Sequence, residues 1–203
     1  MKTIKNILFD IGHVLLSFYP EAAAREFAVY SSRPADRFGP EHVFLPEILH
    51  SFERGQISSE QYYEAFIQES GCRMSFRHFS ILWCKHFSLI RPMVELGRKL
   101  SRKYSIYFFS DTSPLHVPPL YHLFPALLFF HGQALSYELG AMKPEREFFQ
   151  LACERLGLDP AECLFIDDQP ANVDVARDFG IRSIHHRDPE QSASGILAAL
   201  DLA

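Results

Sequence analysis

Short apolar runs alternate with amphipathic segments over much of the chain. Four of these runs have the length and composition of strands that are buried on both faces of a parallel sheet. They cover residues 4–9, 105–109, 163–166 and 181–184, and a further candidate strand covers residues 127–130. Because helical patterns separate the later runs, we expect an open parallel α/β sheet.

Two helices are predicted around the third of these strands. The first opens at Pro144, carries acidic residues in its first turn and ends at Gly157. The second covers residues 170–179 and is closed by Gly180. Strand and helix therefore alternate in this half of the chain, as they do in a parallel sheet covered by helices.

Residues 16–90 follow a different pattern. We find no convincing strand there, whereas Ser58 and Gln61 have the spacing of a capping box at the start of a helix. Apolar positions at helical spacing continue beyond it. This interval is therefore expected to be a helical insertion of about four helices after the first strand.

Composition narrows the function classes. Hydrophobic residues make up 47% of the chain and charged residues 22%, which favours a folded core over disorder. The net charge is −5, and the charged residues are well mixed without a basic run. We therefore expect neither nucleic acid nor a membrane surface as a partner. The start MKTIKN lacks the apolar region of a signal peptide, and no apolar run reaches transmembrane length. The cysteines lack CxxC spacing and are expected to be reduced thiols of a cytoplasmic protein: Cys72, Cys84, Cys153 and Cys163.

Polar residues stand at or just after the ends of the predicted strands, or directly before a helix. In an open α/β sheet, ligands bind at the carboxyl ends of the strands. Each residue by itself also has an ordinary explanation as a turn, a helix cap or a solvated side chain. Two adjacent carboxylates are less ordinary, because they repel each other unless a cation neutralises them. The residues are Asp10, Ser110 and Asp111 in FFSDT, Lys143, and Asp167 and Asp168 in LFIDDQPAN.

Taken together, these residues contain the parts of a phosphoryl-transfer site. A carboxylate such as Asp10 can act as a nucleophile and form an aspartyl-phosphate. Several carboxylates beside a phosphate call for a hard cation such as Mg²⁺. The hydroxyl of Ser110 and backbone N–H groups can hold phosphate oxygens, and Lys143 can stabilise charge on the transferring group.

The order of these motifs resembles the haloacid dehalogenase superfamily of phosphohydrolases over essentially the whole chain. The motifs are FDIGHVL, SDTSPLH, KPEREFF and IDDQPANV. Together with ERGQISSEQYYEAF in the insertion, they are most similar to the bacterial alpha-D-glucose-1-phosphate phosphatase subgroup. The resemblance implies a Rossmann-like core, residues 1–15 and 91–203, with an inserted α-helical cap, residues 16–90.

The resemblance also implies roles for single residues. Asp10 would be the nucleophile, and Ser110 and Lys143 would hold the phosphoryl group, with Lys143 also acting in catalysis. The metal site for Mg²⁺ would consist of Asp10, the backbone carbonyl of Gly12, Asp168 and Asp167.

The sequence departs from the superfamily two residues after Asp10. Most of its phosphatases have a second aspartate there as general acid and base, whereas this chain has Gly12. The similar subgroup also tends to have glycine. Three interpretations remain: a leaving group that departs with little help, a substitute acid such as His13, or a weak or silent enzyme. His13 has the alternative of bonding only to backbone or facing the cap.

Three further residues carry alternatives. Asp111 stands where asparagine is common, and its carboxylate would oppose anion binding unless it is paired or turned away. Its backbone N–H remains a candidate phosphate donor. Glu53 and Arg54 are candidates for contact with a sugar or a second anion, but we favour a charged helix end before a Gly55 cap. Apolar packing within the cap is expected for Tyr19, Phe44 and Phe52.

The sequence thus predicts a Mg²⁺-dependent phosphomonoesterase that acts on a small phosphorylated metabolite, with sugar phosphates among the candidates. Two alternatives are a dehalogenase in which Asp10 attacks carbon, and a catalytically weak or silent ligand-binding member of the fold. We expect a monomer or a weak homodimer. Activity that depends on magnesium would argue against the dehalogenase, and turnover of an activated aryl phosphate would argue against the silent ligand-binding protein.

Overall fold

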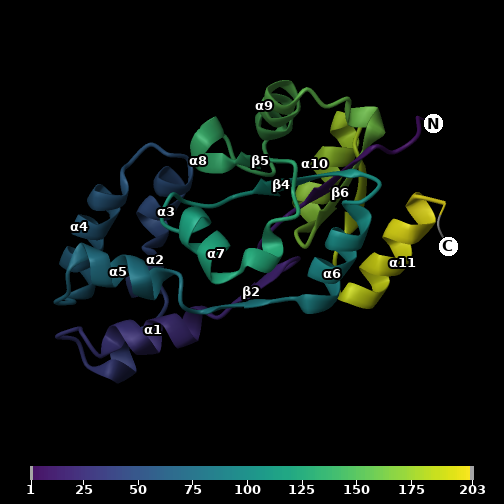
Figure 1. Cartoon of the computed structure of the whole chain (residues 1–203). Helices are drawn as coiled ribbons and strands as arrows, with labels where there is room; N and C mark the ends of the chain where they lie inside the picture. The colour runs from purple at the N-terminus through teal and green to yellow at the C-terminus, as the bar shows by residue number, and fades with distance from the viewer. Residues whose placement is uncertain (1, 202–203) are drawn as a thin grey trace.

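The computed structural model describes residues 2–201, with a five-stranded parallel sheet at its centre (Figure 1). The order across the sheet is β5-β4-β1-β6-β7, so the first strand of the chain lies in the middle. This arrangement confirms the expected α/β fold. The strands are β1 (Asn6–Phe9), β4 (Ser105–Ser110), β5 (Gly132–Leu135), β6 (Cys163–Asp167) and β7 (Arg182–His185).

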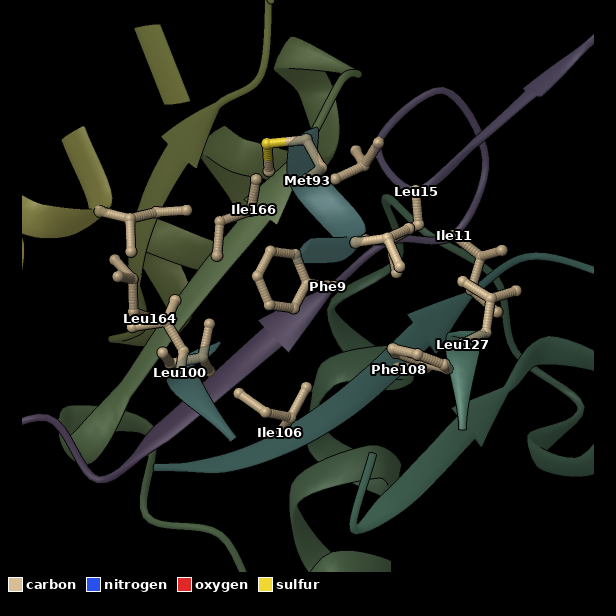
Figure 2. Packing of buried hydrophobic residues seen from close by; sticks show 14 of the residues in the cluster. Phe9, Ile11, Leu15, Met93, Leu100, Ile106, Phe108, Leu127, Leu164 and Ile166 are labelled. Atoms are coloured by element: carbon tan, nitrogen blue, oxygen red, sulfur yellow. The ribbon is translucent and has the colours of Figure 1, made fainter. Parts of the chain in front are cut away.

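Helices cover both faces of this sheet, because alternate strand residues point to opposite sides. Phe9 and its neighbours on one face pack with α6 (Arg91–Leu100) and α11 (Pro189–Ala199), as Figure 2 shows for Phe9, Met93 and Ile166. Leu8 faces the other side, where α9 (Arg146–Leu156) and α10 (Pro170–Phe179) pack. Two further helices, α7 (Val117–Leu123) and α8 (Ser136–Leu139), follow β4 and β5.

The predicted helical insertion forms a separate hydrophobic cluster that includes Phe27, Phe66 and Trp83. Its helices gather at one side of the sheet, away from α6 and α11 (Figure 1). The capping box is confirmed, since Ser58 Oγ accepts the N–H of Gln61 at 3.2 Å. The helices are α1 (Pro20–Ala28), α2 (Glu41–Phe44), α3 (Pro46–Glu53), α4 (Ser59–Ser70) and α5 (Phe76–Trp83).

The expectation that this interval contains no strand was wrong. Strand β2 (Leu16–Phe18) lies at the start of the insertion and β3 (Phe87–Leu89) at its end, and the two pair as a short antiparallel ribbon. Each strand has three residues, which is too short for an alternation pattern to be visible in the sequence. Because the two partners are far apart in the chain, only the folded structure brings them together.

The prediction of a strand at residues 127–130 was also wrong. Leu127 ends a short 3₁₀ helix, and Phe130 packs on Phe108 with ring centroids 4.6 Å apart. The fifth strand is instead Gly132–Leu135, which carries a glycine and a glutamine. The apolar run therefore fills the core from a loop, while a more polar segment completes the sheet.

Helix boundaries elsewhere differ by small amounts. The helix expected to open at Pro144 begins at Arg146, with Glu145 at the preceding N-cap position, and it ends before Gly157 as expected. Short 3₁₀ turns lie at Ala35–Arg37 and Pro160–Glu162. Within residues 2–201, no helix has both the length and the apolar character needed to cross a bilayer.

Candidate active site

The carboxyl ends of β1, β4 and β6 bring the predicted site residues to one edge of the sheet. The strands are parallel and in register, with Phe9 opposite Phe108 on one side and Ile166 on the other. Asp10 follows β1, and its N–H donates to the carbonyl of Ile166 at 2.9 Å. Ser110 ends β4 and Asp167 ends β6. Three separate segments of sequence therefore meet at this edge.

Lys143 joins these segments with three hydrogen bonds from its ammonium. The Nζ atom donates to Asp10 Oδ1 at 2.8 Å, to Asp167 Oδ2 at 2.7 Å and to the carbonyl of Phe109 at 3.0 Å. The side chain is only 2% exposed. Burial opposes its charged form, yet the carboxylates of Asp10 and Asp167 hold the pKa of Lys143 above its usual value. The ammonium is therefore a fixed charge of the site.

Asp10 lies in a region with more carboxylates than cations. Burial raises the pKa of Asp10, Lys143 acts against that rise, and the carboxylates of Asp167 and Asp168 add to it. Its Oδ1 is bound to Lys143, whereas Oδ2 has no hydrogen bond among the described residues. One carboxylate oxygen is thus held by Lys143, and the other accepts no hydrogen bond from the described residues.

Asp167 and Asp168 are adjacent but have different surroundings. Asp167 is fully buried, and besides Lys143 it accepts bonds from the side-chain amide of Asn172 at 3.0 and 3.1 Å and from the N–H of Gln169 at 2.8 Å. Asp168 is half-buried and accepts one bond from the Gln169 side chain at 2.6 Å. Asp167 is therefore saturated by protein donors, while Asp168 keeps most of its oxygen lone pairs available.

The loop after β4 is held by a residue that the motifs did not identify. The buried hydroxyl of Ser136 accepts the N–H of Thr112 at 2.9 Å and donates to the carbonyl of Thr112 at 3.1 Å. Asp111 accepts the backbone N–H of Lys143 at 3.1 Å through its carboxylate, and burial raises its pKa. A serine at a strand end has no distinctive sequence signal, so this role is visible only in the structure.

A cavity of 320 Å³ lies over this edge, between the strand-end loops and the insertion. The loops contribute Gly12, His13, Ser110, Asp111 and Thr112, and the insertion contributes mainly aromatic and apolar side chains. His13 is exposed at the cavity and has a left-handed backbone with φ of 52°. Its N–H donates to the carbonyl of Leu16 at 2.7 Å. The remaining lining residues are Ile11, Leu16, Phe18, Phe44, Leu49, Glu53, Trp83, Phe87, His116 and Leu120.

The side chains of Glu53 and Arg54 have different surroundings in the structure, although the two residues are neighbours in sequence. The turn expected after them is present, with Gly55 at φ of 69°. Arg54 pairs with Glu145 and donates to the carbonyl of Gly140 at 3.3 Å, so it holds the insertion to the core. Glu53 lines the cavity instead. Of the aromatic residues expected to pack in the insertion, Phe52 is buried and Phe44 is partly buried, but Tyr19 is 50% exposed.

The residues fit a magnesium ion better than a transition metal. Among residues 2–201, no group of three or more histidine, cysteine or carboxylate side chains is gathered as a ready metal site. Mg²⁺ needs only one or two protein carboxylates, because waters and substrate phosphate complete its shell. Asp10 and Asp168 are the carboxylates that could hold such an ion, and the excess negative charge around Asp10 favours a cation there.

A carboxylate and a buried lysine meet at the carboxyl edge of a parallel sheet, beneath a helical insertion, and this arrangement is typical of a hydrolase of the α/β class. Comparison with known proteins agrees, since residues 4–180 match the haloacid dehalogenase-like hydrolase family. The chain belongs to that family.

Named relatives extend over almost the whole chain. D-ribitol-5-phosphate phosphatase of Bacteroides thetaiotaomicron is 24% identical over 94% of each chain. A solved haloacid dehalogenase family enzyme from the same organism has a TM-score of 0.78 and 28% identity, covering 92% of this chain and 95% of its own. Its complex with magnesium and inorganic phosphate has a TM-score of 0.77 and 27% identity, covering 91% and 94%.

Proposed function

We propose that this phosphatase is a Mg²⁺-dependent phosphomonoesterase that works through an aspartyl-phosphate on Asp10. One observation carries the proposal: the Lys143 ammonium is buried between Asp10 and Asp167 at the carboxyl edge of the sheet. A fixed cation beside a carboxylate with one free oxygen suits the transfer of a dianionic phosphoryl group.

In this proposal Asp10 Oδ2 attacks phosphorus, and the substrate's ester oxygen departs. Water then attacks the phosphorus of the aspartyl-phosphate, which releases inorganic phosphate and restores the carboxylate. Lys143 and the Ser110 hydroxyl bind the phosphoryl oxygens, and the backbone N–H of Asp111 is a further donor. Asn172 acts indirectly, because it orients the Asp167 carboxylate that in turn holds Lys143.

Mg²⁺ would be held by Asp10, the Gly12 carbonyl and Asp168, and when bound it would neutralise charge on the phosphoryl oxygens. The sequence also predicted Asp167 as a metal ligand. Since its oxygens already accept bonds from Lys143, Asn172 and Gln169, we propose Asp167 as a support for the site.

Gly12 has no side chain to protonate the departing oxygen. His13 is our proposed substitute, because it lies at the cavity that would hold the leaving group. Its replacement by glutamine is expected to slow hydrolysis of an alkyl phosphate more than that of an aryl phosphate, whose leaving group needs little protonation. Equal slowing of both substrates would assign His13 to binding.

The substrate is proposed to be a small phosphorylated metabolite that enters between the core (residues 1–15 and 91–203) and the insertion as its cap (residues 16–90). The sequence motifs are similar to those of the alpha-D-glucose-1-phosphate phosphatase subgroup and leave sugar phosphates among the candidates, whereas the named relative, a D-ribitol-5-phosphate phosphatase, favours a polyol phosphate. We expect a cytoplasmic monomer or weak homodimer, and the four buried free thiols are consistent with a reducing compartment.

The direct test is hydrolysis of p-nitrophenyl phosphate with and without Mg²⁺ by the wild-type protein and by Asp10→Asn. We expect Asp10→Asn to lose about 10⁴-fold or more in kcat, as the removal of a nucleophile does. Asp174→Asn is the matched control, because Asp174 is exposed on α10 and should leave turnover unchanged. Unchanged activity in Asp10→Asn would refute the mechanism, and metal-independent release of halide from a 2-haloacid would favour the dehalogenase alternative.

A further inference from the structure

One wall of the 320 Å³ cavity contains polar groups that the proposed chemistry does not use. Glu53 comes from the end of α3, Trp83 from the end of α5, and His116 from the loop before α7. Ser110 and Asp111 of the strand-end loop line the same cavity. These three residues therefore share a cavity with the strand-end loop that the proposed chemistry uses.

Glu53 is placed where a carboxylate is unfavourable for folding. It is the last residue of α3, at the negative end of the helix dipole. It has no hydrogen bond or ion pair among the described residues, and burial together with the Asp111 carboxylate raises its pKa to about 7. An uncompensated carboxylate in a cavity is more typical of a binding group than of a structural one.

Its position is fixed by the turn that follows. Gly55 has φ of +69°, and a Cβ atom there would lie 2.3 Å from the carbonyl oxygen of Tyr137. Arg54 is held by Glu145, so the adjacent guanidinium does not neutralise Glu53. The turn thus directs the carboxylate to the cavity and the guanidinium to the core.

Trp83 and His116 each have a ring nitrogen without a partner. Their rings stack with centroids 5.3 Å apart, and Trp83 Nε1 and His116 Nε2 are buried without a hydrogen bond. Trp83 is only 2% exposed. Burial lowers the pKa of His116 to about 3, so its ring is neutral at physiological pH. The wall therefore contains, in Trp83, an N–H donor without an acceptor and, in Glu53, an acceptor without a donor.

We propose that this wall is the leaving-group subsite and that Glu53 selects an uncharged, hydroxyl-bearing group over one with a second anionic group. The inference rests on the proposed phosphomonoesterase function. Hydroxyl groups can donate a hydrogen bond to Glu53 and accept one from the Trp83 indole N–H, so a polyol can satisfy both groups. A carboxylate or second phosphate would face Glu53 and Asp111, and no lysine or arginine is among the described residues that line the cavity.

The test compares two substrates that differ only at the end remote from the phosphate: D-ribitol 5-phosphate and D-ribonate 5-phosphate, whose terminal CH₂OH is a carboxylate. The ratio of their kcat/KM values is measured for wild type, Glu53→Gln and Glu47→Gln. We expect wild type to favour the ribitol ester and Glu53→Gln to reduce that preference by about tenfold. Glu47 is exposed on the same helix, so its variant should retain the wild-type ratio.

A second measurement does not depend on turnover. In the Asp10→Asn background with Mg²⁺, ribitol 5-phosphate should raise the melting temperature more than ribonate 5-phosphate, and adding Glu53→Gln should narrow the difference. Trp83→Phe keeps an aromatic ring but removes the donor, and it should raise KM for ribitol 5-phosphate by about fivefold.

The two proposals fail in different ways. If wild type does not hydrolyse p-nitrophenyl phosphate with Mg²⁺, the proposed function is wrong. If it does, but Glu53→Gln leaves the substrate ratio unchanged, only the subsite is wrong. An equal fall in kcat for both ribose-derived esters at constant ratio would overturn the inference too, because Glu53 would then act on the reaction step.

Discussion

Two polar regions of the molecule, one around Lys143 and the other in the cavity wall of Glu53, Trp83 and His116, are built in opposite ways. Around Lys143, every buried charge has a partner, and Asp167 alone accepts bonds from three different residues. In the cavity wall, Glu53, Trp83 and His116 have polar atoms with no partner among residues 2–201. The first region is organised before a ligand arrives, whereas the second becomes satisfied only with one. The comparison separates groups that hold the reacting atoms from groups that recognise the rest of the substrate.

Removal of Lys143 should have the largest effect on stability. Lys143→Met leaves Asp10 and Asp167 buried without their cation, and we expect a loss of about 3–5 kcal/mol at pH 8. The loss should be smaller at pH 5, because protonation can then neutralise the carboxylates. Urea unfolding at both pH values measures this. Lys85→Met is the control, since Lys85 is 56% exposed in a surface pair with Glu26 and should cost at most about 1 kcal/mol.

A substitution at Gly55 tests whether the close approach of this turn to Tyr137 fixes the position of the wall that contains Glu53. Gly55→Ala adds a Cβ atom that would approach the Tyr137 carbonyl, in a left-handed backbone, and we expect a cost of about 2–3 kcal/mol. Gly140→Ala is the matched control, because Gly140 has φ of +73° but no atom within 4 Å of the added Cβ. That variant should lose about 1 kcal/mol by thermal unfolding. Equal losses would show that the contact with α8 does not matter.

Glu53→Gln should change stability in the opposite direction to Lys143→Met. The folded state raises the pKa of Glu53 to about 7 from an ordinary value of 4.5. Its ionised form is therefore less favourable in the folded than in the unfolded chain, and this contribution to stability is lost as pH rises between those two values. The glutamine variant should be more stable than wild type by about 1–2 kcal/mol at pH 8 and nearly equal to it at pH 4.

The control for this prediction is Glu47→Gln, on the exposed face of α3, which should show no such pH dependence. A destabilised Glu53→Gln at pH 8 would mean that the carboxylate has a structural partner, and the contrast between the two regions would be lost. We expect Glu53→Gln to be more stable than wild type and to discriminate less well between the two substrates, which is a trade-off between stability and function.

Much of the core was predictable from local patterns. Apolar runs identified β1, β4 and β6, since central parallel strands are buried on both faces and need no long-range information to be recognised. The run at residues 181–184 also covered most of β7, although that strand lies at the edge of the sheet and is only partly buried. The strand ends then placed Asp10, Ser110 and Asp167 at one edge, and the structure does bring them there. The fifth strand was missed because Gly132–Leu135 is less apolar than the loop that precedes it.

By itself, the sequence determined which chemical groups stand at the ends of the strands, because strand periodicity and the residues that follow it are local properties of the chain. Only the tertiary structure decided what those groups do to each other. Asn172 and Lys143 saturate Asp167, Arg54 turns to Glu145, and Glu53 is left facing the cavity. Each outcome depends on contacts between distant segments, and hydrogen-bond partners and burial are properties of those contacts.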